Sequence, residues 1–474
     1  MNQNLTPLAD ALLKQTNETI ESFDVPGHKG DFDALVEYFG SKCVSLDKNS
    51  RESIDYLCRP RGVIFEAEQL AAEAFGAKEA FFMVGGTTAA IHAMVMCACA
   101  PGDKIILPRN VHYSVINAVI LSGAIPIYIE PKVHPVLGIS LGICIEDLEV
   151  CIRQNTDAKA VLVNNPTYYG VCSDMRKIVE IAHAYQMYVL ADEAHGTHFY
   201  FSDKLPEAAM HCGADLSAVS MHKTGGSFTQ SSLLLSSGSI DKDYISDVIN
   251  LTCTTSASYL LMASLDIARR NLAVNGKTLI SKTIEMVEET RKKINEIDGF
   301  YAFSEEIIDG ESVYDFDITK LSVNTRVAGF TGIEVYTKLR DEYQIQLEFG
   351  DVCNFLAICT FADKVSSHYK LIDALRDISL QKGESDKIPE YEYISPIIKL
   401  SPRKAFYSKK KIIPVIESEN RIASCAVMSY PPGIPLLAPG ELITGKIIDH
   451  ILLSSQKGCS VSGIDEEMRI FVVD

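Results

Sequence analysis

Residues 189–199 read VLADEAHGTHF. The first part is an apolar run that stops at two carboxylates, Asp192 and Glu193, and the second part adds His195 and His198. A short apolar run with an abrupt polar end is typical of a buried strand in a parallel sheet. The tetrad D-E-A-H has three possible uses: in a nucleotide-driven motor, as a metal site, or as a carboxylate that serves an organic cofactor. The rest of the chain decides among them.

The segments around this run alternate between two kinds of pattern. Amphipathic or buried helices are predicted at 65–77, 87–100, 112–123, 145–155 and 175–186, and apolar strands at 80–84, 103–108, 124–130, 158–165, 187–192, 215–222 and 231–237. This alternation predicts an α/β fold with a mostly parallel sheet and helices on both faces. Ligands of such sheets bind beyond the carboxyl ends of the strands, so we expect Asp192, the SMHK run at 220–223 and the GGTT run at 85–88 to converge.

The second half of the chain has a different pattern. Residues 252–297 read as a long helix, and strands and helices mix after about residue 298. This change predicts a second, smaller α+β domain. A Pro- and Gly-rich stretch, SYPPGIPLLAPGE (429–441), lies inside it.

Composition limits the class of protein. The chain has 474 residues and a formal charge of −18, which argues against nucleic-acid binding and mildly favours a cationic substrate. Its thirteen cysteines are scattered without a CxxC pair, as in reduced cytosolic proteins. No basic, apolar signal segment and no uncharged run of about 18 residues occurs. We therefore expect a soluble cytoplasmic protein with neither a membrane nor a nucleic acid as partner.

Two of the three readings of D-E-A-H fail on the sequence. A motor needs the phosphate loop G-x-x-x-x-G-K-[ST], and HKTGGS (222–227) has its lysine before its glycines. A catalytic metal needs three or four converging ligands, and His195 and His198 could meet one only if the turn after Asp192 were helical. We therefore expect no metal.

The third reading needs an amine near Asp192, and Lys223 provides it within SAVSMHKTGG. A lysine among small residues at a strand end can form a Schiff base with the aldehyde of pyridoxal 5′-phosphate (PLP). Asp192 would keep the pyridine nitrogen protonated, and Ala194 would leave room for the ring face. The start of the helix after GGTT offers backbone N–H groups and hydroxyls to the phosphate, Ser220 adds a hydroxyl, and His112 could stack on the ring.

These motifs carry a resemblance to a known family. They stand in DVPGHKGD (24–31), EAEQLAAEAFGA (66–77), FFMVGGTTAAIHAM (81–94), LPRNVHYS (107–114), NNPTYYGVCSDM (164–175), SMHKTGGSFTQSSLLL (220–235), TSASYLLMASLDIAR (255–269) and SYPPGIPLLAPGE. The chain resembles the Orn/Lys/Arg decarboxylase family, major-domain type, whose members are PLP enzymes of the aspartate-aminotransferase-like fold (fold type I). The likeness covers nearly the whole chain. Its length is similar to that of the short bacterial forms without a wing domain, often called arginine decarboxylases.

The resemblance assigns roles to residues. It implies a Schiff base at Lys223, a pyridine-nitrogen partner at Asp192, and His195 at the reacting face. The other cofactor-binding positions that it implies are Gly86, Thr87, Thr88, His112, Asn165, Thr167, Ser220 and His222. It also implies that the PGHKG segment, with His28, and the 429–441 segment, with Glu441 as acceptor for a distal cation, lie on the substrate side.

The implied organisation is an N-terminal arm at 1–65, a PLP-binding large domain at 66–297 and a C-terminal α+β region at 298–474. At least a homodimer with shared active sites is also implied. The implied reaction is decarboxylation of a basic L-amino acid to its amine and carbon dioxide, a step of polyamine biosynthesis. Arginine comes first among the substrates, then lysine or ornithine, with Lys223 or His222 returning a proton to the α-carbon.

Alternatives stay open within and outside this chemistry. An aminotransferase or lyase on the same fold would release other products, and a binding or regulatory relative would have lost Lys223. The chain also departs from the family pattern. Gly85 stands where Asn is usual, and Arg59 and Arg61 lie in a loop where we expect Asn, Pro or acidic residues. Because of these two arginines, a noncanonical amino acid stays open as an alternative substrate.

Overall fold

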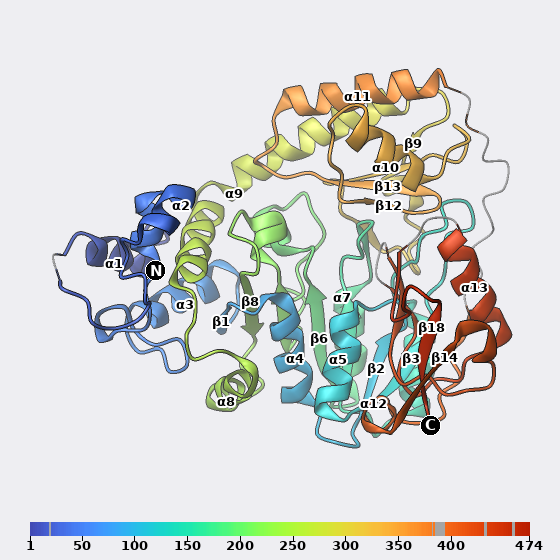
Figure 1. Ribbon diagram of the computed structural model, residues 1–474, viewed down its shortest axis with the longest axis horizontal. Helices are drawn as coiled ribbons and strands as arrows, with labels where there is room; N and C mark the ends of the chain where they lie inside the picture. The colour runs from blue at the N-terminus through green and yellow to red at the C-terminus, as the bar shows by residue number, and fades with distance from the viewer. Residues whose placement is uncertain (19, 382, 384–393, 431–433, 457–459) are drawn as a thin grey trace. The chain divides into compact units, whose positions relative to one another are not determined.

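The computed structural model describes residues 1–474 except 19, 382, 384–393, 431–433 and 457–459 (Figure 1). The chain forms two compact units. The first comprises Met1–Cys97, Leu190–Asp203 and Glu207–Leu279, and the second comprises Ala98–Val189, Lys204–Pro206 and Ile280–Asp474. Within the described ranges no helix combines the length and the apolar character that a membrane crossing requires.

The first unit contains the strands that end at the key motifs. In order they are β1 (Glu79–Met83), β8 (Ser232–Ser236), β7 (Leu216–Val219) and the end of β6 (Tyr188–Glu193). β8 runs antiparallel to both neighbours, and β6 runs parallel to β7. Because helices cover both faces of such a sheet, its strands are continuous apolar runs, and the three leucines of β8 are fully buried. The parallel pair brings the ends of β6 and β7 to one edge.

The helices of the first unit are α1 (Pro7–Thr16), α2 (Asp33–Leu46), α3 (Val63–Ala74), α4 (Gly86–Ala98), α8 (Lys242–Thr252) and most of α9 (Tyr259–Ile294). The first unit also has three short helical turns: η1 (Glu52–Ile54) between α2 and α3, η2 (Thr197–Phe201) between β6 and β7, and η3 (Met221–Gly225) between β7 and β8. Asp266 of α9 fixes the N-terminal arm, because its carboxylate accepts from the backbone N–H groups of Leu8 and Ala9 and pairs with Arg269 at 2.6 Å. This buried carboxylate supplies acceptors that the first turn of α1 lacks.

The second unit begins with a parallel group of strands. β2 (Lys104–Pro108) lies between β3 (Ile125–Ile129) and β4 (Ala160–Asn164), and the connecting helices are α5 (Tyr113–Ser122), α6 (Ile145–Gln154) and α7 (Met175–Ala184). α5 ends where the sequence predicts. Gly123 takes the left-handed conformation (φ 77°) and its N–H bonds the carbonyl of Val119.

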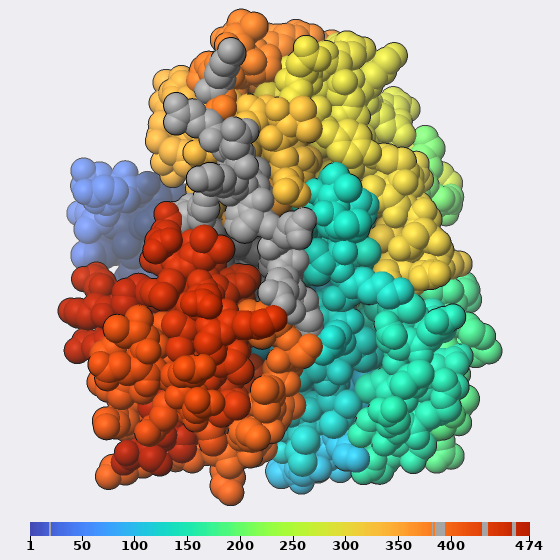
Figure 2. Space-filling view, turned by 90° about the vertical axis from the view of Figure 1, so that its right-hand side faces the viewer, coloured from blue at the N-terminus to red at the C-terminus, as the bar shows by residue number. Residues whose placement is uncertain are grey.

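Two separate hydrophobic cores follow in the region from about residue 298. One lies between α10 (Gly332–Asp341), α11 (Val365–Ser379) and an antiparallel sheet of β12 (Phe349–Gly350), β13 (Asn354–Ile358), β11 (Lys320–Asn324) and β9 (Tyr301–Ala302). β5 (Val171–Cys172) pairs with β10 (Asp315–Phe316), next to the short turn η4 (Glu305–Ile307). The chain after residue 395 builds the other core and forms a contiguous orange and red surface in Figure 2.

This last core joins two small sheets. They are β14 (Lys410–Pro414) with β18 (Arg469–Val473), and β16 (Ile434–Leu437) with β15 (Val427–Tyr430) and β17 (Ser460–Ser462); the helices are α12 (Pro402–Tyr407), α13 (Gly445–Gln456) and the turn η5 (Val415–Glu417). The sequence predicts one C-terminal α+β region at 298–474, and this division stays a prediction. Among the described residues of this part of the chain, two groups of buried hydrophobic residues share no member.

Candidate active site

The two carboxylates of D-E-A-H have different surroundings. Asp192 lies near the end of β6 with 3% of its surface exposed, and its Oδ1 accepts from the N–H of Ala194 at 3.1 Å. Burial raises the pKa of Asp192, while the nearby charge of Lys223 lowers it. Keeping Asp192 ionised at this buried position therefore costs free energy unless a cation lies beside it. A protonated ring nitrogen would be such a partner.

Glu193 is satisfied by the chain itself. Its carboxylate accepts from the hydroxyls of Tyr200 and Ser217, each at 2.5 Å, and from the N–H of Ala209 at 2.9 Å. Burial raises the pKa of Glu193 to about 7. This carboxylate therefore binds β6 to β7 and to the chain beyond η2, and its role is structural.

Lys223 and His195 meet in the first unit. Lys223 is half-buried in η3, a single π-helical turn directly after the end of β7, and its Nζ lies 2.9 Å from Nε2 of the buried His195. Next to it, Nδ1 of His222 donates to the carbonyl of Ser231 at 3.0 Å, and burial lowers the pKa of His222. His222 is therefore held as a neutral ring with its proton on Nδ1.

A group of hydroxyls lies at the start of α4. The Thr87 hydroxyl contacts those of Ser220 and Ser232, the latter at 2.8 Å, and all three residues are buried. Gly86 begins the helix with φ 71°, and Thr88 is exposed. A helix N-terminus with hydroxyls on a neighbouring strand is a common site for a phosphate group.

The remaining predicted cofactor residues lie in the second unit. Nδ1 of His112 accepts from the N–H of Ser114 at 3.2 Å, directly before α5. Asn165 Oδ1 accepts from the N–H of Ser173 at 2.8 Å, and the hydroxyl of Thr167 accepts from the N–H of Val171 at 3.2 Å. These bonds fix the side chains in their loops. Their contacts with a cofactor stay predictions.

Glu441 has a partner that the sequence does not reveal. Its Oε2 lies 2.9 Å from Nη2 of Arg109 and accepts from the N–H of Ala438 at 2.7 Å. Both side chains are buried, and the Arg109 guanidinium lies 5.1 Å from the centre of the Tyr128 ring. Burial raises the pKa of Glu441, and Arg109 lowers it. The one available signal was a charged residue directly after the apolar run KIILP.

His28 lies in the N-terminal arm. Its Nδ1 accepts from the N–H of Gly30 at 3.0 Å, so the ring carries its proton on Nε2, which lies 3.1 Å from Oδ2 of Asp47. The bonds hold the ring against α2. The substrate-side role of His28, like that of Glu441, stays a prediction.

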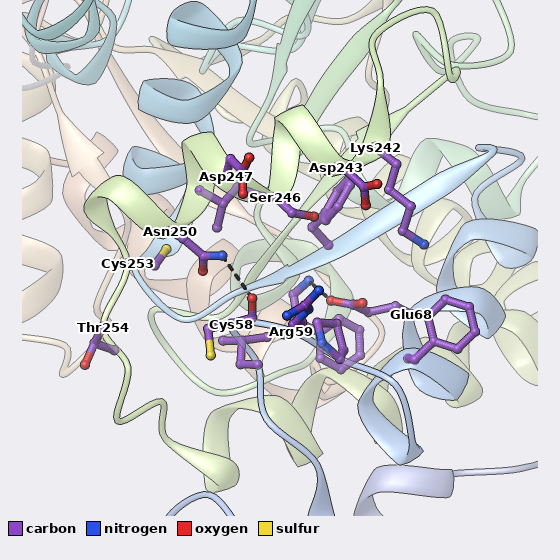
Figure 3. A pocket seen from close by; sticks show the side chains of 16 residues that line it. Cys58, Arg59, Glu68, Lys242, Asp243, Ser246, Asp247, Asn250, Cys253 and Thr254 are labelled. Atoms are coloured by element: carbon purple, nitrogen blue, oxygen red, sulfur yellow. Dashed lines mark hydrogen bonds between the residues drawn. The ribbon is translucent and has the colours of Figure 1, made fainter.

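Arg59 lines a cavity of about 630 Å³ in the first unit (Figure 3). The walls are the 57–60 loop and one face of α8, and Phe81, Phe82 and the buried Glu68 also line it. Nδ2 of Asn250 on α8 donates to the carbonyl of Cys58 at 2.9 Å across this cavity. No local pattern in the sequence marks the cavity, because its walls come from separate segments.

Comparison with known proteins identifies the family. The model of the Orn/Lys/Arg decarboxylase major domain matches residues 6–347, and that of the Orn/Lys/Arg decarboxylase C-terminal domain matches residues 391–470. The chain belongs to the Orn/Lys/Arg decarboxylase family. The match at 391–470 covers most of the last hydrophobic core.

The relatives of this decarboxylase agree with that assignment. The arginine decarboxylase of Bacillus subtilis (strain 168) is 42% identical over 474 residues, covering 98% of this chain and 97% of that protein. The constitutive lysine decarboxylase of Escherichia coli (strain K12) is 22% identical and covers 98% of this chain and 80% of that one. The family assignment confirms the expectation of an amino acid decarboxylase.

Solved structures show the fold. The lysine decarboxylase of Francisella novicida superimposes with a TM-score of 0.86 at 20% identity, covering 99% of this chain and 81% of that chain. The ureidoglycine-glyoxylate aminotransferase of Bacillus subtilis gives 0.54 at 13% identity, covering 67% and 84%. The expected α/β fold of type I PLP enzymes is confirmed.

Proposed function

We propose that this decarboxylase uses PLP and acts on a basic L-amino acid, with arginine first and lysine or ornithine next. The observation that carries the proposal is the half-buried Lys223, whose Nζ lies 2.9 Å from His195 beside the buried Asp192. Arginine comes first because the Bacillus subtilis relative at 42% identity is named arginine decarboxylase.

The residues of the first unit fit the cofactor. Lys223 would supply the amine for its aldehyde, Asp192 the anion for its ring nitrogen, and Thr87 with Ser220 the hydroxyls for its phosphate. When bound, PLP supplies a protonated ring that withdraws electrons from the α-carbon of the substrate. On the family resemblance we extend the proposal to Gly86, Thr88, His112, Asn165, Thr167, Ala194 and His222.

The chain's own groups handle the proton. Lys223 Nζ and His195 Nε2 share a proton across 2.9 Å, so the imidazole can hold it while the amine is neutral. When that proton passes from His195 to Lys223 Nζ, the resulting ammonium can donate it to the α-carbon. His222 is the second candidate, because its proton on Nδ1 leaves Nε2 able to accept one. His28 and Glu441 are the candidate substrate contacts.

Borohydride reduction and product analysis test this proposal. Reduction of the purified enzyme should fix one pyridoxyl group on Lys223, found by peptide mass spectrometry. Lys223→Ala should lose it, and Lys277→Ala, a change at an exposed lysine paired with Asp203, should keep it. A colourless protein without an adduct would refute the cofactor. Keto acids in place of carbon dioxide and amine, across a panel of L-amino acids, would favour an aminotransferase.

We further propose at least a homodimer with shared active sites, a cytoplasmic location and a role in polyamine biosynthesis. The N-terminal arm exposes Phe23, Tyr38 and Phe39 by 97%, 83% and 65%, which suits coverage by a second copy. Every cysteine in the described part of the chain is a free thiol, as expected in a reducing compartment. Sedimentation of the purified enzyme tests the oligomeric state, and a monomer would refute it.

A further inference from the structure

Three potential metal ligands gather at the end of β13. Cys359, Asp363 and His368 come from a run of ten residues that leads into α11, and one donor atom of each lies within 4.8 Å of the others. Cys359 and His368 are buried, with 5% and 7% exposed, while Asp363 is exposed. All three lie in the second unit, and none belongs to the proposed cofactor site.

The tautomer of His368 is fixed for coordination. The Thr290 hydroxyl donates to the carbonyl of Met286 at 2.7 Å, so its oxygen accepts from Nδ1 of His368 at 2.8 Å. The ring proton is therefore on Nδ1, and the lone pair is on Nε2. Nε2 lies 3.7 Å from Oδ2 of Asp363. In metal-binding histidines, one ring nitrogen typically donates a hydrogen bond that orients the ring, and the other ring nitrogen binds the metal.

We propose that Cys359 Sγ, Asp363 Oδ2 and His368 Nε2 bind a divalent transition metal, with Zn²⁺ favoured. Zinc bonds of roughly 2.0–2.3 Å place tetrahedral donors about 3.3–3.7 Å apart, so donor atoms that lie within 4.8 Å of one another must close by at most about 1.5 Å. Thiolate and imidazole donors suit zinc and disfavour Mg²⁺ or Ca²⁺. Asp363 is exposed, so an ion could enter from the solvent and a water molecule could serve as the fourth ligand.

The surroundings of the Cys359 thiol determine whether it carries a proton that must be released when a metal binds. Burial, with a smaller effect of Asp363, raises the pKa of Cys359 to about 12, while Arg291 and Lys320 lower it. On binding, the S–H bond breaks, its electron pair forms the bond to the metal, and the proton passes to the buffer. One proton is therefore released per ion, and the affinity rises with pH.

Bound metal would tie three elements together. Cys359 follows β13, His368 is on α11, and Thr290, which orients His368, is on α9. An ion that binds the folded chain but not the unfolded one stabilises the fold by mass action. The role we assign to the metal is thus the stability of this unit, independent of the reaction at Lys223.

Cobalt titration tests the site in the full-length, tag-free, PLP-loaded enzyme after treatment with a chelator. One equivalent of Co²⁺ should give a thiolate-to-cobalt charge-transfer band, release one proton and be displaced by Zn²⁺. Cys359→Ser should lose the band. Cys151→Ser, a half-buried thiol of α6 in the same unit, should keep it.

Two outcomes would overturn the proposal: no band in the native enzyme, or an unchanged band in Cys359→Ser. If that variant fails to fold, Asp363→Asn serves instead. An asparagine oxygen can still accept from the N–H of Thr360, as Asp363 does at 2.9 Å, so the turn is kept. This variant should bind Co²⁺ at least about tenfold more weakly, in the range seen when a ligand shell is disturbed. Equal affinity would refute the assignment.

Discussion

Replacing Glu193 by Gln tests whether the two carboxylates of D-E-A-H have different roles. The N–H of Ala209 is a fixed donor, so the amide oxygen of Gln takes the place of Oε1. Its NH₂ group then faces the hydroxyls of Tyr200 and Ser217, which can rotate to accept. Glu193→Gln therefore keeps the three contacts and removes the charge.

The pKa of Glu193 sets the size of the effect. Folding raises this pKa from 4.5 to about 7, because the carboxyl group is buried. At 1.36 kcal/mol per unit, this is about 3 kcal/mol. The folded state holds the proton more tightly than the unfolded state, so stability is lost as pH rises from 4.5 to 7. The variant should lack this loss and should equal or exceed the native enzyme in stability above pH 7.

Urea unfolding at pH 5.5 and pH 8, followed by fluorescence and by activity, measures the difference. The native enzyme should lose more stability between these pH values than Glu193→Gln, which should retain decarboxylation. Asp192→Asn is the contrast. In the PLP-loaded enzyme it should lower kcat on the order of a hundredfold, as expected for a lost preorganised charge. If the two variants behave alike, the division between a structural and a cofactor-binding carboxylate is wrong.

Three further changes follow from the contacts. Thr87→Val removes a donor to a phosphate, so PLP affinity, measured by fluorescence titration, should fall at least about tenfold, because such charged bonds contribute about 1.5–3 kcal/mol. Arg109→Met leaves Glu441 buried without its cation and should cost about 3–5 kcal/mol of unfolding free energy in urea, and adding Glu441→Gln should recover part of it. His195→Gln removes the proton partner of Lys223, so the pH profile of kcat should lose one of its limbs while PLP stays bound, as seen by absorbance.

Most of the fold could be predicted because its elements are locally marked. The run VLAD becomes β6, and the glycine at 123 ends α5, as the patterns indicate. The roles of Asp192 and Glu193 could not be separated this way. Successive strand residues point to opposite faces, and the partners of Glu193 at 200, 209 and 217 are chosen only when β6, β7 and the following turns have packed.

The features that could not be predicted depend on contacts between residues that lie far apart in the sequence. Arg109 and Glu441 are 332 positions apart, and no local period links them. The Arg59 cavity draws on three separated segments. The metal-binding group is local, but its tautomer depends on Thr290, 78 positions before His368. Composition also could not divide 298–474, because both of its cores use the same aliphatic residues.

The Arg109–Glu441 pair limits how Glu441 could bind the distal cation of a substrate. The pair is formally neutral, and in the described part of the chain Oε1 of Glu441 has no hydrogen-bond partner. A substrate cation at Oε1 would lie close to the guanidinium, and like charges about 4 Å apart repel by about 4 kcal/mol at the effective dielectric of a protein. If Glu441 is nevertheless the acceptor, Glu441→Gln should raise KM for arginine and lysine and leave KM for an isosteric neutral amino acid unchanged. An equal rise for all three would show that the carboxylate acts through Arg109 and not on the distal charge.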